Sequence, residues 1–307
     1  MVRRAIPLAA VAALAGLLAG CAALNARDLP QRSATLHVQY LLTSEGETSF
    51  LRVIVVVPKT IPGRQFVEAV EWQPEPLRVW DAGECRYAEF LFSDPQPTYT
   101  VELTARVVLG AYDLSHAMQR VARGAPRPAV PEDLRPYLVA EPGMQKDDPA
   151  IVEVAKGLTI AGDDVGTVRR AFDFVVEHMQ STGYDLESHG AVEALTEGTG
   201  DCTEYADLFV ALVRAAGIPA RHVSGYLAND AVDTPQHSWA EVYLKGMGWV
   251  PFDPVLCDGG QCTFDSLGPQ HLSVSPLRND ELLDNQMFVV YRWWGDRVTL
   301  TETVDFR

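Results

Sequence analysis

The chain of 307 residues lacks, after residue 21, any apolar run long enough to cross a membrane as a helix. It also lacks low-complexity tracts and internal repeats, which excludes a repeat architecture. Basic residues are scarce, since 25 lysines and arginines face 41 acidic residues and leave a formal charge of −16. This balance disfavours nucleic acid and anionic phospholipid surfaces as partners. Apolar residues, by contrast, make up 47% of the chain, which is enough for two cores of domain size.

The first part of the chain shows the period of two that is typical of half-buried antiparallel strands. Apolar side chains alternate with polar ones over residues 35–40 and 99–107, and FLRVIVVVP predicts a more buried strand. Residues 34–123 are therefore predicted to form a β-sandwich of immunoglobulin-like architecture. A Pro-rich linker over residues 124–139 leads to a second domain, residues 140–307, which begins with two amphipathic helices.

One cysteine stands where a helix is predicted to begin. In GTGDCTEYADLFVALVRAAG, two glycines allow a sharp turn, Asp201 is a good N-cap residue, and Cys202 falls in the first helical turn. The apolar residues that follow recur at helical spacing and surround most of the helix, which is typical of a central, buried helix. The positive end of the helix dipole favours a thiolate at Cys202. The alternative, a small buried hydrophobe, suits neither the glycines nor the aspartate.

Two further side chains lie where they could serve this thiol. HSWAEVYL predicts a strand, KGMG a turn and GWVPFDP the antiparallel return strand, so His237 and Asp253 both fall toward the open end of a hairpin. A carboxylate there can hold the imidazole's tautomer while the other ring nitrogen faces a thiol. If Leu244 pairs with Trp249, the carboxylate falls opposite Ala240, and a stagger or bulge must bring it to the imidazole. Taken singly, the histidine could be a surface residue at a strand end and the aspartate part of an Asp-Pro turn.

The blocks GDCTEYADLFVALVRAAGIPARHVSGY, HSWAEVYL and GWVPFDP resemble the transglutaminase-like superfamily, which has a papain-like α+β core. The resemblance covers residues 140–307 and rests on blocks that match in order and spacing. It implies that Cys202 is the nucleophile, His237 the base and later acid, and Asp253 the residue that orients the imidazole. Tyr184, in STGYD, resembles an aromatic residue that precedes the cysteine block, which implies an oxyanion or substrate contact. The stretch SPLRNDELLD departs from a late GRD-like motif of the family and puts substrate contacts from that region in doubt.

The N-terminus resembles a bacterial lipoprotein signal. A basic start precedes an apolar run that is too short for a spanning helix and ends in LAGC. The resemblance implies removal of residues 1–20, a lipid on the thiol of Cys21 and a tether over residues 21–33. An ordinary secretory signal is the alternative. Because residue 22 is alanine and not aspartate, the pattern resembles outer-membrane sorting, facing the periplasm, in a bacterium with two membranes.

The remaining cysteines fit an oxidising compartment. Cys257 and Cys262 bracket a flexible Asp-Gly-Gly-Gln segment, which predicts a local disulfide. Half of a metal site is the alternative, but the sequence offers no second ligand pair at a diagnostic spacing. Cys85 is predicted to be a buried thiol of the sandwich. No cofactor or metal ion is expected.

Together these features predict a lipid-anchored thiol enzyme of the cell envelope. Cys202 would form a thioester from a protein or peptide amide, with its backbone N–H in the oxyanion hole. Water would resolve the thioester in a cysteine peptidase or amidase, and an amine would resolve it in glutamine–lysine cross-linking. A different class stays open, in which the same fold is a non-catalytic lipoprotein that binds a peptide or a partner. Selective labelling of the thiol at neutral pH would separate these two classes.

Overall fold

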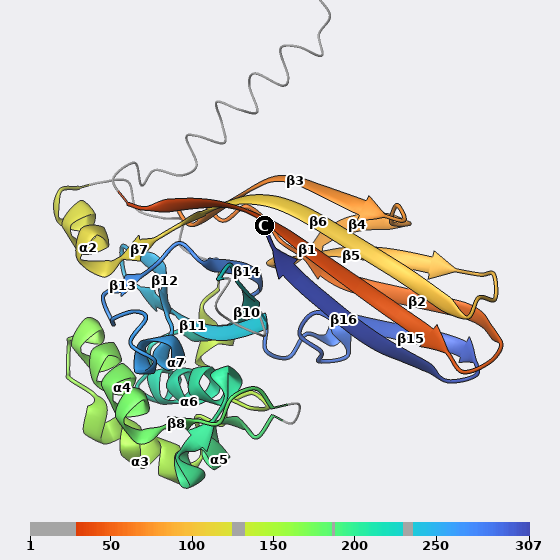
Figure 1. Cartoon of the computed structure of the whole chain (residues 1–307). Helices are drawn as coiled ribbons and strands as arrows, with labels where there is room; N and C mark the ends of the chain where they lie inside the picture. The colour runs from red at the N-terminus through yellow and green to blue at the C-terminus, as the bar shows by residue number, and fades with distance from the viewer. Residues whose placement is uncertain (1–28, 125–132, 186–187, 230–235) are drawn as a thin grey trace, which may run out of the picture.

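The computed structural model describes residues 29–124, 133–185, 188–229 and 236–307. The predicted signal peptide, Cys21 and residues 125–132 of the predicted linker lie outside these residues. The described chain is an α+β protein whose β-sandwich lies against a second part that carries most of the helices (Figure 1). None of the helices in the described ranges has the length and apolar character needed to cross a bilayer.

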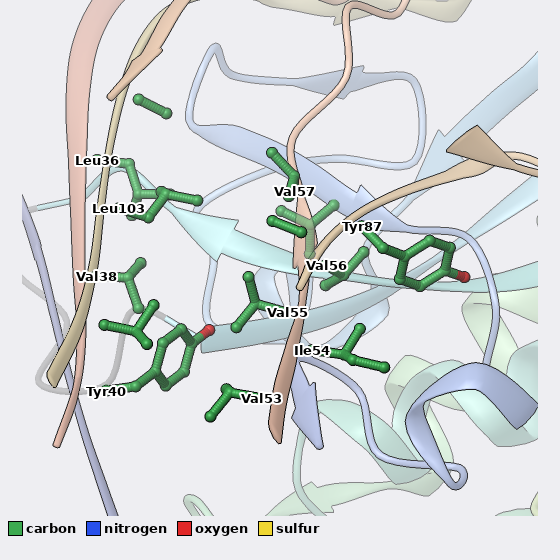
Figure 2. Close-up of a cluster of buried hydrophobic side chains, with 14 of the residues drawn as sticks. Leu36, Val38, Tyr40, Val53, Ile54, Val55, Val56, Val57, Tyr87 and Leu103 are labelled. Atoms are coloured by element: carbon green, nitrogen blue, oxygen red, sulfur yellow. The ribbon is translucent and has the colours of Figure 1, made fainter. Parts of the chain in front are cut away.

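The sandwich consists of two four-stranded antiparallel sheets. In spatial order, the first contains β16 (Val298–Phe306), β1 (Gln31–Ser44), β6 (Thr98–Gly110) and β3 (Gln65–Gln73). The second contains β15 (Val289–Gly295), β2 (Thr48–Val57), β5 (Cys85–Phe92) and β4 (Arg78–Ala82). One face of the alternating strands is apolar, so each sheet covers the other. Figure 2 shows Leu36 and Leu103 from the first sheet facing Val55 from the second across this core.

The C-terminal hairpin belongs to the sandwich and not to the second domain, where the predicted boundary of residues 140–307 placed it. Strand β16 pairs with β1, with Val304 opposite Val38, and β15 pairs with β2. Each sheet thus receives an edge strand from the end of the chain. The alternating pattern marks residues 289–306 as strands, but it carries no information about which sheet they join.

The second part combines a four-stranded antiparallel sheet with helices packed on it. The sheet contains, in order, β12 (Gly248–Phe252), β11 (Gln236–Leu244), β10 (Ala220–Leu227) and β14 (His271–Ser275). The helices are α3 (Pro149–Leu158), α4 (Asp164–His178), α5 (Gly190–Glu197), α6 (Cys202–Ala215) and α7 (Pro254–Asp258). Helix α6 is central, and every residue from Thr203 to Arg214 is buried, because apolar residues surround it and pack on the sheet and on α3, α4 and α5.

Shorter elements complete the fold. They are α2 (Leu114–Ala122), η1 (Arg135–Leu138), η2 (Glu281–Leu283), β7 (Tyr112–Asp113) paired with β13 (Ser266–Leu267), and β8 (Gln180–Ser181) paired with β9 (Thr199–Gly200). The core of the sandwich continues into the second part, since Tyr226, Leu272 and Val274 of β10 and β14 are buried in it. The two parts therefore share apolar contacts along β10 and β14, while the helices of the second part pack around a core of their own.

Candidate active site

Cys202 is the first residue of α6, and hydrogen bonds at the helix start set its place. Asp201 is the N-cap and accepts from the backbone N–H of Thr203 at 2.6 Å. Glu204 accepts from the backbone N–H of Asp201 at 3.2 Å, which completes a capping box. A Cβ on Gly200 would lie 2.4 Å from the Cβ of Glu204, so only glycine fits before the cap. The predicted helix start is confirmed, and Cys202 is half-buried there.

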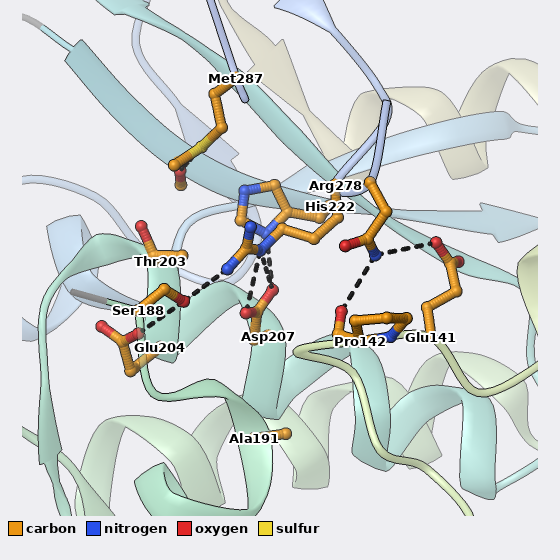
Figure 3. Close-up of polar contacts among 12 residues, drawn as sticks. Glu141, Pro142, Ser188, Ala191, Thr203, Glu204, Asp207, His222, Arg278 and Met287 are labelled. Atoms are coloured by element: carbon orange, nitrogen blue, oxygen red, sulfur yellow. Dashed lines mark hydrogen bonds and ion pairs between the residues drawn. The ribbon is translucent and has the colours of Figure 1, made fainter. Parts of the chain in front are cut away.

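A second polar network holds α6 one turn further along. Asp207 is fully buried and bonds to His222 Nδ1 at 2.8 Å and to Arg278 Nε at 3.1 Å (Figure 3). Arg278 also donates to Ser188, whose hydroxyl lies beside Glu204 (Figure 3). Burial lowers the pKa of His222 although Asp207 opposes this, which favours the neutral ring, and Arg278 forms the ion pair with Asp207. The stretch SPLRNDELLD, which departs from the family motif, thus supplies an arginine that positions α6.

His237 and Asp253 meet at the end of the β11–β12 hairpin, where the imidazole Nε2 lies 2.8 Å from the carboxylate Oδ2. The predicted register is wrong by one residue, because Leu244 pairs with Gly248 and not with Trp249. Side chains alternate between the faces of a sheet, so this shift moves the carboxylate onto the face that carries the imidazole. The two side chains therefore meet without a bulge between β11 and β12.

A second histidine shares the carboxylate of Asp253. His271, the first residue of β14, places its Nε2 2.8 Å from the same Oδ2. The other carboxylate oxygen accepts from the backbone N–H of Leu256 at 3.0 Å and caps α7. Asp253 is fully buried, and these three donors compensate its charge. Sequence reasoning missed His271, because it follows Asp253 by 18 residues in a strand that carries no motif.

The charges at the site favour an imidazolium at His237. Burial opposes protonation, but the carboxylate of Asp253 and the hydrogen-bonded Cys202 outweigh it and raise the pKa of His237 to about 10. Burial also opposes ionisation of Asp253, yet His237 and His271 hold the pKa of that carboxyl well below its usual range. With Nε2 engaged by Asp253, the ring has Nδ1 left for the sulfur of Cys202. The structure thus brings together the thiol, imidazole and carboxylate that thiol acyl transfer requires.

Tyr184 precedes α5, and 60% of it is exposed. Partial burial and the negative charges of Asp201, Glu302 and Cys202 raise the pKa of its hydroxyl. Its contact with an oxyanion or a substrate stays a prediction.

His237, Asp253 and His271 offer three ligand atoms within 4.8 Å of one another, a spacing that could hold a metal ion. The Nε2 atoms of His237 and of His271 are each hydrogen-bonded to the same oxygen of Asp253 at 2.8 Å. A metal ion there would have to replace both hydrogen bonds. The three ligand atoms are thus already paired with one another in a hydrogen-bonded acid–base site.

The predicted disulfide between Cys257 and Cys262 is present. It closes the segment that follows Asp253, and Cys262 Sγ lies 3.5 Å from the carbonyl oxygen of Asp253. Cys85 is a buried free thiol in the sandwich, as predicted, and Cys202 is also free. The bridge therefore constrains the chain beside the carboxylate and leaves the candidate nucleophile reduced.

Comparison with known proteins agrees with this geometry. Residues 153–254 match the family model of the Transglutaminase-like superfamily, and this span contains Cys202, His237 and Asp253. The similarity to this superfamily covers less than half of the chain and is confined to this domain. The domain holds all three residues of the candidate triad, whereas His271 lies beyond the matched span.

Relatives of the transglutaminase-like domain match only part of the chain. An uncharacterized protein of Haemophilus influenzae is 34% identical over 149 residues, which cover 39% of this chain and 40% of the relative. The protein YebA of Bacillus subtilis is 37% identical over 68 residues, which cover 18% of this chain and 9% of the relative. The chain thus spans less than half the length of either relative.

One solved structure matches both parts of the fold. It is a crystal structure from Cytophaga hutchinsonii, described as that of a candidate cysteine protease. The match covers 91% of this chain and 92% of the other, with a TM-score of 0.64 and 18% identity. The likeness shows that the β-sandwich and the transglutaminase-like part occur together as one fold.

Proposed function

We propose that this chain is a thiol enzyme of the cell envelope that cleaves amide bonds in protein or peptide substrates. The observation that carries the proposal is a half-buried thiol at a helix start, beside an imidazole that a buried carboxylate holds at 2.8 Å. The charged partners raise the pKa of this imidazole to about 10, a perturbation that is common at catalytic sites. A module that only binds peptides has no need of these three groups in contact.

The reaction would begin with the thiolate of Cys202, stabilised by the His237 imidazolium and by the N-terminal end of α6. The sulfur attacks the carbonyl carbon of the amide. The resulting oxyanion accepts from the Cys202 N–H, one of the first-turn donors that have no partner within a helix. The imidazolium then protonates the departing amine through Nδ1, and a thioester remains.

Hydrolysis of the thioester returns the enzyme to its starting state. The neutral His237 takes a proton from water, whose oxygen attacks the thioester carbonyl. The carboxylic acid leaves, and the sulfur departs as a thiolate beside the re-formed imidazolium. Asp253 keeps the same ring nitrogen protonated throughout. We assign hydrolysis as the main reaction, because water is the default acceptor and an amine must exclude it to compete.

The proposed location in the envelope is supported by the N-terminal sequence, where LAGC follows a short apolar run. A lipid on Cys21 would hold the enzyme at a membrane surface while the described fold remains outside the bilayer. Its substrates would then be proteins or peptides of the same compartment.

The proposal is tested by incubating the full chain with envelope extract and an isotope-labelled amine. New protein N-termini and incorporated amine are then counted by mass spectrometry for native protein, Cys202→Ala and Cys85→Ala. The last variant is a matched control, since it removes a free thiol buried in the sandwich. We expect new N-termini with native protein and with Cys85→Ala, and none with Cys202→Ala. Amine incorporation without new N-termini would reassign the reaction to amine transfer, and full activity of Cys202→Ala would refute the thiol mechanism.

A further inference from the structure

A small cavity lies behind the candidate active site, where the sandwich meets the second part. Arg64, Gln65, Tyr112, Trp239 and His271 are among its lining residues, and about 30 Å³ is open to the centres of water molecules. The Tyr112 hydroxyl and His271 Nδ1 are buried and have no hydrogen-bond partner within the described part of the chain. Buried polar atoms are usually satisfied, by ordered water where protein groups are out of reach. The cavity has room for about two water molecules.

The hydrogen bonds of His271 have a defined direction. Asp253 is ionised, because the pKa of its carboxyl lies well below the usual range, so Oδ2 can only accept. His271 therefore donates from Nε2, and in the neutral ring Nδ1 is an acceptor. Burial raises the pKa of Tyr112, so its hydroxyl stays protonated and can donate into the cavity. The Tyr112 hydroxyl and the second ring nitrogen of His271 thus belong to one cavity, where a water molecule can accept from the first and donate to the second.

The sandwich also holds the strand that carries His271. Gln65 of β3 is 2% exposed, and its side-chain amide accepts from the N–H of Ser273 and donates to the carbonyl of Ser273, both at 2.8 Å. The amide also donates to the carbonyl of Lys59 at 2.6 Å, which fixes it within the sandwich. Ser273 is two residues from His271 on β14. The side-chain amide of Gln65 thus pairs with the backbone of β14 as a residue of a neighbouring strand would. Tyr112 belongs to β7, which pairs with β13 shortly before β14.

We propose that His271 is a positioning residue for the His237–Asp253 pair, and that its place is set by Gln65 of the β-sandwich and by Tyr112 of β7. The proposal rests on the proposed thiol chemistry and adds to it. His271 acts through Asp253 Oδ2, the atom from which His237 takes its orientation. A carboxylate that met one imidazole alone could rotate together with it, whereas a second donor on a different strand prevents this. The sandwich is then a structural component of the active site.

Two isosteric variants separate positioning from stability. The glutamine amide reaches the place of Nε2, so His271→Gln keeps a donor for Asp253, whereas His271→Asn is too short to do so. His37→Asn is the control, because His37 forms a histidine–aspartate pair with Asp305 at 3.3 Å on the polar face of the sandwich. The readout is the pH profile of Cys202 alkylation by iodoacetamide in the full chain. Mass spectrometry follows the Cys202 peptide, and thermal unfolding is measured in parallel.

We expect His271→Asn to slow alkylation of Cys202 at pH 6 by about tenfold, as for the loss of one hydrogen bond to a charged group. His271→Gln and His37→Asn should stay within about twofold of the native rate. No effect of His271→Asn, or an equal effect of His271→Gln, would overturn the positioning role and leave the thiol chemistry standing. If Cys202 in the native protein reacts no faster than in the unfolded chain, the proposed function fails and this proposal with it.

The part played by the sandwich is tested by coupling between variants. Gln65→Met removes both hydrogen bonds to Ser273, and Tyr112→Phe removes only a hydroxyl. We expect each to slow alkylation of Cys202 at pH 6 by about threefold. In the His271→Asn background neither should have a further effect, because both act through His271. Effects that multiply in the double variants would overturn the link between the sandwich and His271.

Discussion

Replacing Asp253 with asparagine should remove the charge on which the candidate active site depends. The carboxylate accepts from His237 and His271 through one oxygen at 2.8 Å, and from the N–H of Leu256 through the other at 3.0 Å. Asparagine has one acceptor oxygen and one NH₂ donor at these two places. If the oxygen faces the imidazoles, the NH₂ group faces the N–H of Leu256 and the cap of α7 is lost. If the amide is reversed, the NH₂ group faces both imidazoles.

The size of the effect follows from the pKa of His237. A rise from the ordinary 6.5 to about 10 corresponds to about 5 kcal/mol in favour of the imidazolium. Burial opposes the rise, and Asp253 contributes more to it than Cys202 does. Without the carboxylate, we expect the pKa of His237 to fall by about 3 units, which is about a thousandfold in the stability of the imidazolium. Turnover should fall by about the same factor, because the ring also loses the partner that holds its tautomer.

Histidine labelled with ¹³C at Cε1 allows the titration of His237 to be followed by NMR, with His237→Gln to assign the signal. Asp258→Asn is the matched control, since Asp258 ends the same short helix, is exposed and accepts from Tyr205 at 2.9 Å. We expect titration near pH 10 in the native protein and in Asp258→Asn, and near or below pH 7 in Asp253→Asn. A titration that stays near pH 10 in Asp253→Asn would refute the reasoning, because the carboxylate would not be its source.

The same shifts make the stability of the protein depend on pH. The folded pKa of His237 lies above its unfolded value, so its contribution is fully present below about pH 6.5 and is lost as the pH rises through 10. The folded pKa of Asp253 is lowered, so its contribution is present above about pH 4 and is lost in acid. Urea unfolding of the native protein should therefore show lower stability at pH 10 than at pH 6. Asp253→Asn should lack this decline.

Three further outcomes are expected. Replacing Cys257 and Cys262 with serine should lower turnover markedly and the unfolding temperature only slightly. The bridge joins residues with a sequence separation of 5, so its chain entropy is worth at most about 2 kcal/mol. Gly200→Ala should destabilise the fold by about 1–3 kcal/mol in urea unfolding and slow thiol alkylation, because the new Cβ would lie 2.4 Å from that of Glu204. Cys21→Ser should release the protein from membranes into the soluble fraction, and an unmodified mature N-terminus found elsewhere by mass spectrometry would contradict this.

The candidate nucleophile and its helix could be predicted because their signals are local. Asp201 precedes Cys202 directly, and the apolar pattern of α6 follows within the same segment. The hairpin that carries His237 and Asp253 was also predictable as a pair of strands. Its register was not, because the turn has three residues between Leu244 and Gly248, with positive φ angles at Gly246 inside the turn and at Gly248 after it. A one-residue difference in loop length reverses the faces of a whole strand.

The parts of the site that were not predicted from the sequence depend on contacts between residues that are far apart in the chain. His271 has no motif, and its link to Asp253 arises only because β14 joins the sheet beside β10. Arg278 lies in a stretch predicted only as a departure from the family pattern, and its partner Asp207 is 71 residues away. The C-terminal hairpin has the same alternation whichever sheet it joins. Periodicity reveals such strands, but tertiary packing decides their partners.

The second part depends on the sandwich through the charged and apolar groups that are buried at their interface. Glu241 of β11 is 1% exposed, and its carboxylate pairs with Arg64 of the sandwich and with Arg221 of β10. Burial opposes the charge of Glu241, but the two arginines hold its pKa well below the usual range. Without the sandwich, this carboxylate would keep only one cation, and Leu272 beside His271 would lose its apolar cover. The transglutaminase-like part therefore depends on the sandwich for the stability of its central sheet, along the same strand that carries His271 to the carboxylate.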